Sequence, residues 1–133
     1  MNNYTIHQLR INSYALLDDI FAIYQSCFNN AIKIPQKEIR KYFLTGFYTI
    51  NYITDITQNK ICGFCMHMVI KKINAVQIDY IAISKSHQGK GLAKLLFNHI
   101  FEKYCENKLL TLECEDHLTN NYKHVIIGNF STK

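Results

Sequence analysis

A loop with two glycines joins a strand-like run to a helix-like run in the second half of the chain. The loop spans Gln88–Ala93 and contains Gly89 and Gly91; the apolar run Ile78–Ile83 precedes it and the amphipathic run Lys94–Tyr104 follows it. The first turn of a helix leaves backbone N–H groups without partners at its positive end. Such a junction binds phosphate oxygens. The sequence therefore predicts that a phosphate-bearing ligand binds at this loop.

Hydrophobic periodicity divides the rest of the chain into regular elements. Strands are expected over Tyr4–Ile11, Tyr48–Ile56, Ile61–Ile70, Ala75–Ser84 and Leu109–Cys114. Helices are expected from Ser13 to Phe28, from Pro35 to Gly46, and over Lys94–Tyr104. Short polar turns between the middle strands favour antiparallel neighbours. We therefore predict an α+β fold, with a mostly antiparallel central sheet flanked by helices, and a single domain over residues 1–133.

Composition excludes several classes of protein. Apolar residues make up 48% and charged residues 19% of the chain, which is typical of a folded domain. A net charge of +5 suits nucleic acid, an anionic membrane surface, an acidic protein or a phosphorylated cofactor, and it does not choose among them. No basic run reaches five residues, so nucleic-acid binding is not favoured. No apolar run approaches the roughly 18 residues of a membrane helix. With no signal-peptide pattern at Met1–Tyr4, we expect a cytoplasmic protein without a membrane partner.

The five cysteines do not suggest a metal or disulfide framework. Cys62 and Cys65 have CxxC spacing, but no second such pair completes a zinc site. Because side chains alternate along a strand, we expect these two thiols on opposite faces. The prediction is reduced structural cysteines and no metal site.

Two familiar phosphate loops do not fit the glycine run. A P-loop requires a glycine where Ser84 stands, and a serine or threonine where Gly91 follows Lys90. A dinucleotide fingerprint requires a third glycine at the position of Lys94, and it requires a preceding βαβ unit instead of hairpins.

Residues 78–116 resemble the GNAT N-acetyltransferases. That family's acyl-CoA loop follows the pattern Gln/Arg-x-x-Gly-x-Gly/Ala between its fourth strand and third helix. The matching segments here are the apolar triplet Ile81–Ile83, the loop Gln88–Ala93 and the pair Leu95-Leu96. The expected order of elements, β-α-α-β-β-β-α-β, is also similar to that of the family. The resemblance implies a GNAT-like fold.

The resemblance also implies acetyl-CoA as the cofactor. The backbone of Ile81, Ala82 and Ile83 would bond the pantetheine arm. The pyrophosphate would be held by Gln88, Gly89, Lys90, Gly91, Leu92, Ala93 and Lys94. The implied activity is acetyl transfer to a primary amine of a protein or small molecule, by direct attack on the thioester.

The resemblance implies that catalysis occurs where the strands Ile78–Ser84 and Leu109–Cys114 separate, with the amide of Ile81 or of a close neighbour as oxyanion donor. Asp79 is the candidate general base, on the strand face expected to carry Gln77, Ile81 and Ile83; a structural, hydrogen-bonded Asp79 is the alternative. Glu113, His67 and His87 are less favoured bases.

Family members often use a tyrosine in a helix after the fifth strand as the acid, and Tyr122 takes that role by position. The family segment Asn-x-x-Ala-x-x-Phe/Tyr-Tyr is compressed here to Asn120-Asn121-Tyr122, which implies a shortened C-terminal part. The alternative function is therefore a non-catalytic GNAT-like module that binds CoA or a protein. Acceptor identity is not readable from the sequence, and we expect a monomer or homodimer.

Overall fold

The computed structural model describes residues 3–28, 34–116 and 121–130, with the backbone alone beyond residue 112. It contains a six-stranded sheet in the order β1-β2-β3-β4-β5-β6. The strands are β1 (Tyr4–Gln8), β2 (Thr49–Asp55), β3 (Lys60–Ile70), β4 (Ala75–Ile83), β5 (Lys108–Asp116) and β6 (Asn121–Phe130). All neighbouring strands are antiparallel except β4 and β5, which are parallel. The predicted, mostly antiparallel sheet is confirmed.

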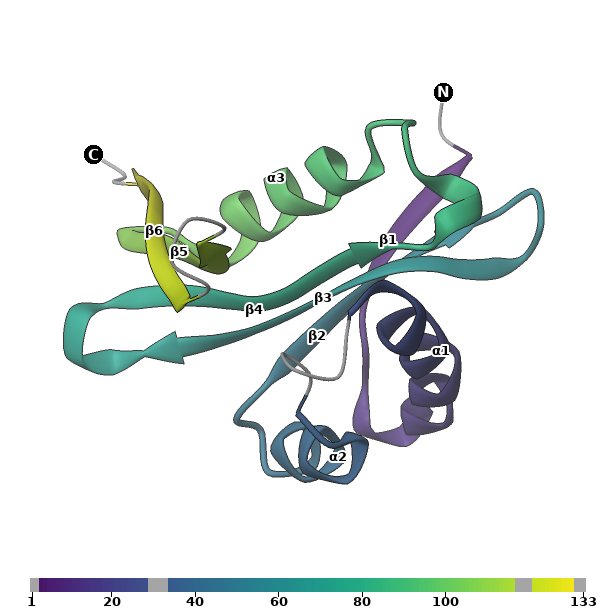
Figure 1. Cartoon of the computed structure of the whole chain (residues 1–133), viewed down its shortest axis with the longest axis horizontal. Helices are drawn as coiled ribbons and strands as arrows, with labels where there is room; N and C mark the ends of the chain where they lie inside the picture. The colour runs from purple at the N-terminus through teal and green to yellow at the C-terminus, as the bar shows by residue number, and fades with distance from the viewer. Residues whose placement is uncertain (1–2, 29–33, 117–120, 131–133) are drawn as a thin grey trace.

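Helices cover both faces of this sheet. Helices α1 (Leu17–Cys27) and α2 (Gln36–Leu44) lie on one face, and α3 (Leu92–Tyr104) lies on the other (Figure 1). Short 3-10 helices are η1 (Ile11–Leu16), η2 (Lys71–Ile73) and η3 (Lys85–His87). The helix α3 is the crossover that the parallel pair β4–β5 requires. The structure therefore confirms the α+β prediction.

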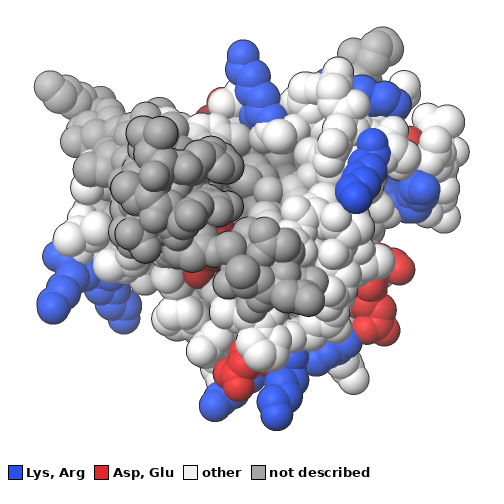
Figure 2. Space-filling view, viewed as in Figure 1, with Lys and Arg blue, Asp and Glu red and all other residues white. Residues whose placement is uncertain are grey.

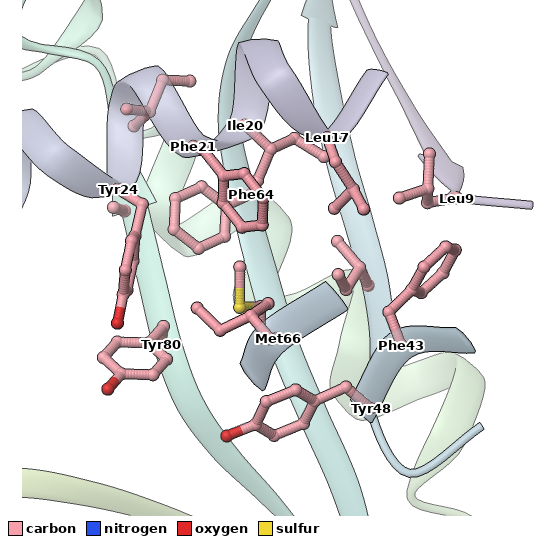
Figure 3. Packing of buried hydrophobic residues seen from close by; sticks show 14 residues of the cluster. Leu9, Leu17, Ile20, Phe21, Tyr24, Phe43, Tyr48, Phe64, Met66 and Tyr80 are labelled. Carbon is pink, nitrogen blue, oxygen red and sulfur yellow. The ribbon is translucent and has the colours of Figure 1, made fainter. Parts of the chain in front are cut away.

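An aromatic core fills the space between the sheet and α1 and α2 (Figure 3). Leu17, Ile20, Phe21 and Tyr24 recur at helical spacing and are buried, as their periodicity predicts. The Tyr24 and Tyr80 rings meet edge to face at a centroid distance of 4.9 Å. Burying each of these side chains contributes about 1.5–3 kcal/mol to the free energy of folding. This packing fixes α1 beside the C-terminal half of β4.

A second core lies between the sheet and α3. Leu92, Leu96 and Ile100 are buried there with Val76 and Ile78 of β4. Leu95, the neighbour of Leu96, is 46% exposed. Leu92, Leu96 and Ile100 are spaced four residues apart and form the row that faces the sheet, and Leu95 lies to one side of that row. The core fixes the first turn of α3 against the end of β4.

Two β-bulges change which face some side chains occupy. Cys62 has no register partner on β2, because Ile53 pairs with Gly63 and Thr54 pairs with Ile61. The prediction that Cys62 and Cys65 face opposite sides is therefore wrong, and both lie in the core beneath α3. A bulge places two consecutive residues opposite one partner, which shifts the alternation by one.

The second bulge lies at Asp79. Met66 pairs with Tyr80 and His67 pairs with Ile78, which leaves Asp79 without a partner on β3. The prediction that Asp79 shares a face with Ile81 and Ile83 is therefore wrong. Ile81 and Ile83 pack toward α3, whereas Asp79 bonds to Tyr48 of the α1 and α2 side.

The C-terminal part forms a strand where the family resemblance implies a helix. The strand β6 pairs antiparallel with β5, and Tyr122 lies opposite Glu115. The β-branched run Val125–Ile127 favours a strand. Within the described residues, β5 ends at Asp116 and β6 begins at Asn121, so the segment that contains Tyr122 is a strand.

We predict that Gly63→Ala destabilises the protein. An added Cβ would lie 2.6 Å from Ile83 Cδ1, 2.8 Å from Ile53 Cγ2 and 2.9 Å from the Ala82 carbonyl oxygen. Overpacking of this kind costs about 1–3 kcal/mol of the free energy of unfolding. Urea denaturation of both proteins measures the difference, and an unchanged midpoint would contradict the close approach of β2, β3 and β4 at this position.

Candidate functional site: an open strand edge beside a two-glycine loop

The parallel strands β4 and β5 separate partway along their length. Their register covers only Ala75–Ile78 against Leu109–Leu112, although β4 continues to Ile83. On the other side of β4, Ile81, Ala82 and Ile83 remain paired with β3. The end of β4 therefore has one open edge within the described part of the sheet, at the place where the family resemblance implied strand separation.

Backbone groups of β4 line that open edge. The Ile83 carbonyl accepts bonds from Gln88 Nε2 at 2.9 Å and Cys27 Sγ at 3.4 Å, both from the side away from β3. Because hydrogen-bonding direction alternates along an antiparallel strand, the N–H and C=O of Ile81 point the same way. Those of Ala82 point to β3. Of the three residues expected to bond a pantetheine arm, Ile81 is placed best to do so.

The loop after β4 has the geometry of an anion cradle. Gly89 and Gly91 adopt φ of +82° and +78°, a region that side chains with a Cβ rarely occupy. Gly91 caps α3, and the Leu95 amide is the one that donates back to its carbonyl. The amides of Leu92, Ala93 and Lys94 precede that bond, so helical geometry gives them no partner within α3. No side chain caps this end, and no acidic residue occupies the first turn.

A pocket of about 340 Å³ joins the open edge to this loop. Its lining comes from the end of α1, from β4 and from the loop: Cys27, Phe28, Ile81, Ala82, Ile83, His87, Gln88, Gly89, Gly91, Leu92 and Ala93. A Cβ added at Gly89 or Gly91 would meet nothing within 4 Å, so the space above both glycines is open. Three lysines that lie in or next to this loop in the sequence are exposed in the structure: Lys85, Lys90 and Lys94. Lys and Arg side chains are spread around the visible face, with small groups at the lower left and at the bottom of the view (Figure 2).

Asp79 is held by two neutral donors on the opposite face of β4. The Tyr48 hydroxyl donates to Oδ2 at 2.7 Å, and Gln77 Nε2 donates to Oδ1 at 2.7 Å. Burial, followed by the Asp79 hydrogen bond, raises the pKa of Tyr48 well above its usual range, so Tyr48 stays protonated and donates. The carboxylate is thus oriented within a partly buried site, an arrangement that suits either a positioned base or a structural Asp.

Comparison with known proteins decides the family. Residues 17–124 match the Acetyltransferase (GNAT) family. The chain is a GNAT acetyltransferase family member. No curated protein matches it closely.

Solved GNAT structures share the fold at low sequence identity. A putative GNAT acetyltransferase from Bacteroides thetaiotaomicron is 15% identical with a TM-score of 0.69, over 86% of this chain and 62% of that one. A GNAT acetyltransferase from Elizabethkingia anophelis with acetyl-CoA bound is 16% identical with a TM-score of 0.62, over 87% and 68%. An aminoglycoside acetyltransferase from an uncultured soil metagenomic sample, in complex with sisomicin, is 18% identical with a TM-score of 0.65, over 77% and 70%.

The structure does not place every candidate catalytic side chain at the separation of β4 and β5. The side chains of Glu113 and Tyr122 lie outside the described residues, so their roles stay predictions.

Within the described ranges, no three His, Cys, Asp or Glu side chains are grouped as metal ligands. None of the helices in those ranges has the length and apolar character needed to cross a membrane.

His87 is buried in η3, at the start of the loop that joins β4 to α3. Its Nε2 lies 2.9 Å from Asp55 Oδ2, and both side chains are less than a tenth exposed. The His87 hydrogen bond lowers the pKa of the Asp55 carboxyl. Sequence reasoning did not connect these residues, because their separation of 32 positions carries no local pattern.

His67 belongs to a separate buried network. Asn51 Nδ2 lies 3.0 Å from His67 Nε2 and donates to the Tyr104 hydroxyl at 3.0 Å, while the hydroxyl donates to Gln8. An amide N–H at that distance requires an unprotonated Nε2, so His67 is neutral. Burial, with a smaller contribution from His99, lowers the pKa of His67 to about 4.

We predict an acid-dependent loss of stability that depends on His67. The unfolded chain takes up a proton at His67 near its ordinary pKa of about 6.5, whereas the folded chain does so only near 4. Above pH 6.5 the neutral His67 therefore does not lower the free energy of unfolding. As the pH falls toward 4, proton uptake by the unfolded chain lowers that free energy by up to about 3 kcal/mol. Urea denaturation from pH 7 to 4 measures the slope. His67→Gln should reduce the slope, and an equal slope in both proteins would contradict the burial of a neutral His67.

Proposed function

We propose that this protein is an acetyl-CoA-dependent N-acetyltransferase that moves an acetyl group to a primary amine by direct attack on the thioester. The observation that carries the proposal is the uncapped first turn of α3, which lies beside the open edge of β4 and shares a pocket with it. Membership of the GNAT family supports it, as does the structural neighbour with acetyl-CoA bound.

The residues of the pocket fit acetyl-CoA. The amides of Leu92, Ala93 and Lys94 and the positive end of α3 would hold the pyrophosphate, with Lys90 adding charge. The Ile81 C=O would accept a hydrogen bond from the pantetheine arm, as it would from an added strand, which leaves the Ile81 N–H for the thioester oxygen. The bound cofactor would supply an acetyl group activated as a thioester.

Acetyl transfer further requires a deprotonated amine and a stabilised oxyanion. The Ile81 N–H points to the open edge, which suits an oxyanion donor. Asp79 would accept a proton from the amine, directly or through a water, because Tyr48 and Gln77 already orient its carboxylate. Tyr122 stays a candidate for protonating the departing thiolate.

The acceptor class stays open between small molecules and proteins. Neighbouring structures include an aminoglycoside acetyltransferase and a ribosomal-protein-alanine N-acetyltransferase from Brucella melitensis biovar Abortus 2308. Both kinds of amine therefore belong in the test.

We predict release of free CoA thiol when the protein is mixed with acetyl-CoA and a suitable amine. A colorimetric thiol assay with an aminoglycoside, a polyamine and a peptide with an N-terminal alanine measures it. Thermal stabilisation by acetyl-CoA without thiol release on any amine would favour the non-catalytic CoA-binding module. No stabilisation by acetyl-CoA would overturn both functions.

We predict that Asp79→Asn lowers kcat by about 100-fold or more, the contribution of a general base. The amide keeps the size of the side chain and an oxygen for the Tyr48 hydroxyl, so the fold should persist. Thiol release at saturating acetyl-CoA measures kcat, and circular dichroism checks folding. Wild-type kcat in a folded Asp79→Asn variant would assign Asp79 a structural role and remove it from catalysis.

A further inference from the structure

We propose that the buried pair Asp55–His87 is a positioning device that holds the cofactor loop in its pyrophosphate-binding shape. The proposal rests on the proposed use of acetyl-CoA and assigns a role to two residues that do not themselves supply the helix amides. His87 lies in η3, directly before Gln88 and Gly89, and it lines the cofactor pocket.

The pair joins two parts of the sheet that the sequence separates. Asp55 ends β2, and its Oδ1 accepts the Gln58 amide at 3.2 Å in the turn toward β3. Its Oδ2 accepts from His87 Nε2. One carboxylate thus fixes both the β2–β3 turn and the loop that leads to α3.

The remaining nitrogen of the ring is also engaged. His87 Nδ1 lies 3.0 Å from Ser84 Oγ and 2.9 Å from Ser86 Oγ. The Ser84 amide donates to the Cys62 carbonyl, and the His87 amide donates to the Ser84 carbonyl. Because both ring nitrogens have partners, the ring cannot rotate without breaking bonds inside a buried site.

The loop beyond His87 has few other anchors. Gln88 reaches back to the Ile83 carbonyl, but Gly89, Lys90 and Gly91 are exposed. Two residues at positive φ follow, and glycine there gives the backbone many alternative conformations. A ligand that needs several amides at once binds weakly when those amides must be ordered on binding. The buried pair removes this cost before the cofactor arrives.

Pantetheine lacks the pyrophosphate that CoA carries, so binding of the two ligands distinguishes a role in pyrophosphate binding from a general structural role. Loss of the pair should weaken binding of CoA and leave binding of pantetheine to the β4 edge unchanged. A purely structural role would affect both ligands equally.

The test compares CoA and pantetheine binding by titration calorimetry in the full chain. His87→Phe keeps a ring of similar size and removes both hydrogen-bonding nitrogens. We expect its Kd for CoA to rise about tenfold or more, with the Kd for pantetheine within twofold of wild type. Asn51→Leu is the matched control, because it removes a buried hydrogen-bonding group of the same sheet in the separate His67 network and should leave both Kd values unchanged.

A second variant keeps the test decisive if His87→Phe does not fold. Asp55→Asn keeps an oxygen for His87 Nε2 and removes the charge, which weakens the bond by about half. We expect a smaller but still CoA-selective loss of about threefold. Equal losses for CoA and pantetheine, or unchanged CoA binding in a folded variant, would overturn the positioning role. Failure of the wild-type protein to bind CoA would instead overturn the proposed function.

Discussion

The parting of β4 and β5 is the constraint on which the other features of the site depend. Parallel pairing stops at Ile78 and Leu112, and β4 runs on with a free edge. Backbone N–H and C=O groups inside a protein need partners. The chain supplies some of its own, since Gln88 and Cys27 bond the Ile83 carbonyl. The groups of Ile81 point into the pocket, where a ligand with an amide of its own can bond them as a neighbouring strand would.

One extra residue in β4 places Asp79 and Ile81 on opposite faces of that strand. Without the bulge at Asp79, strict alternation would put the carboxylate on the same face as Ile81 and Ile83, toward the α3 core. With the bulge, Asp79 meets Tyr48 and Gln77 on the opposite face. Bulges commonly re-aim side chains beside functional sites. The aromatic contacts of Tyr24, Phe28 and Tyr80 then hold α1 against this strand.

Local patterns predicted much of this structure. The alternation over Ile61–Ile70 and Ala75–Ser84, and the helical spacing of Leu17, Ile20 and Tyr24, gave the correct strands and helices. The glycine loop was placed correctly at the junction of β4 and α3, because φ near +80° restricts residue choice at the position itself. These features depend on neighbours in sequence, so the sequence carries them directly.

The sequence predictions that were wrong or incomplete concern features that depend on contacts between residues far apart in the sequence. The faces of Cys62 and Asp79 depend on the register with neighbouring strands, which no periodicity reveals. The Asp55–His87 pair likewise depends on how the β2–β3 turn approaches the loop before α3. Tyr122 was assigned by its order in the family pattern, and the β-branched run near it describes its element, β6, better than that order does.

Cys27 has a practical consequence that follows from its place at the rim of the pocket. It is partly exposed, whereas Cys62, Cys65 and Cys105 are buried. Its sulfur lies against the Ile83 carbonyl and lines the same pocket as Ile81 and Gly89. Among the described cysteines it is therefore the accessible attachment point for a thiol-reactive probe. A fluorophore placed there would lie beside the pocket between β4 and α3 and would report when a ligand occupies that pocket.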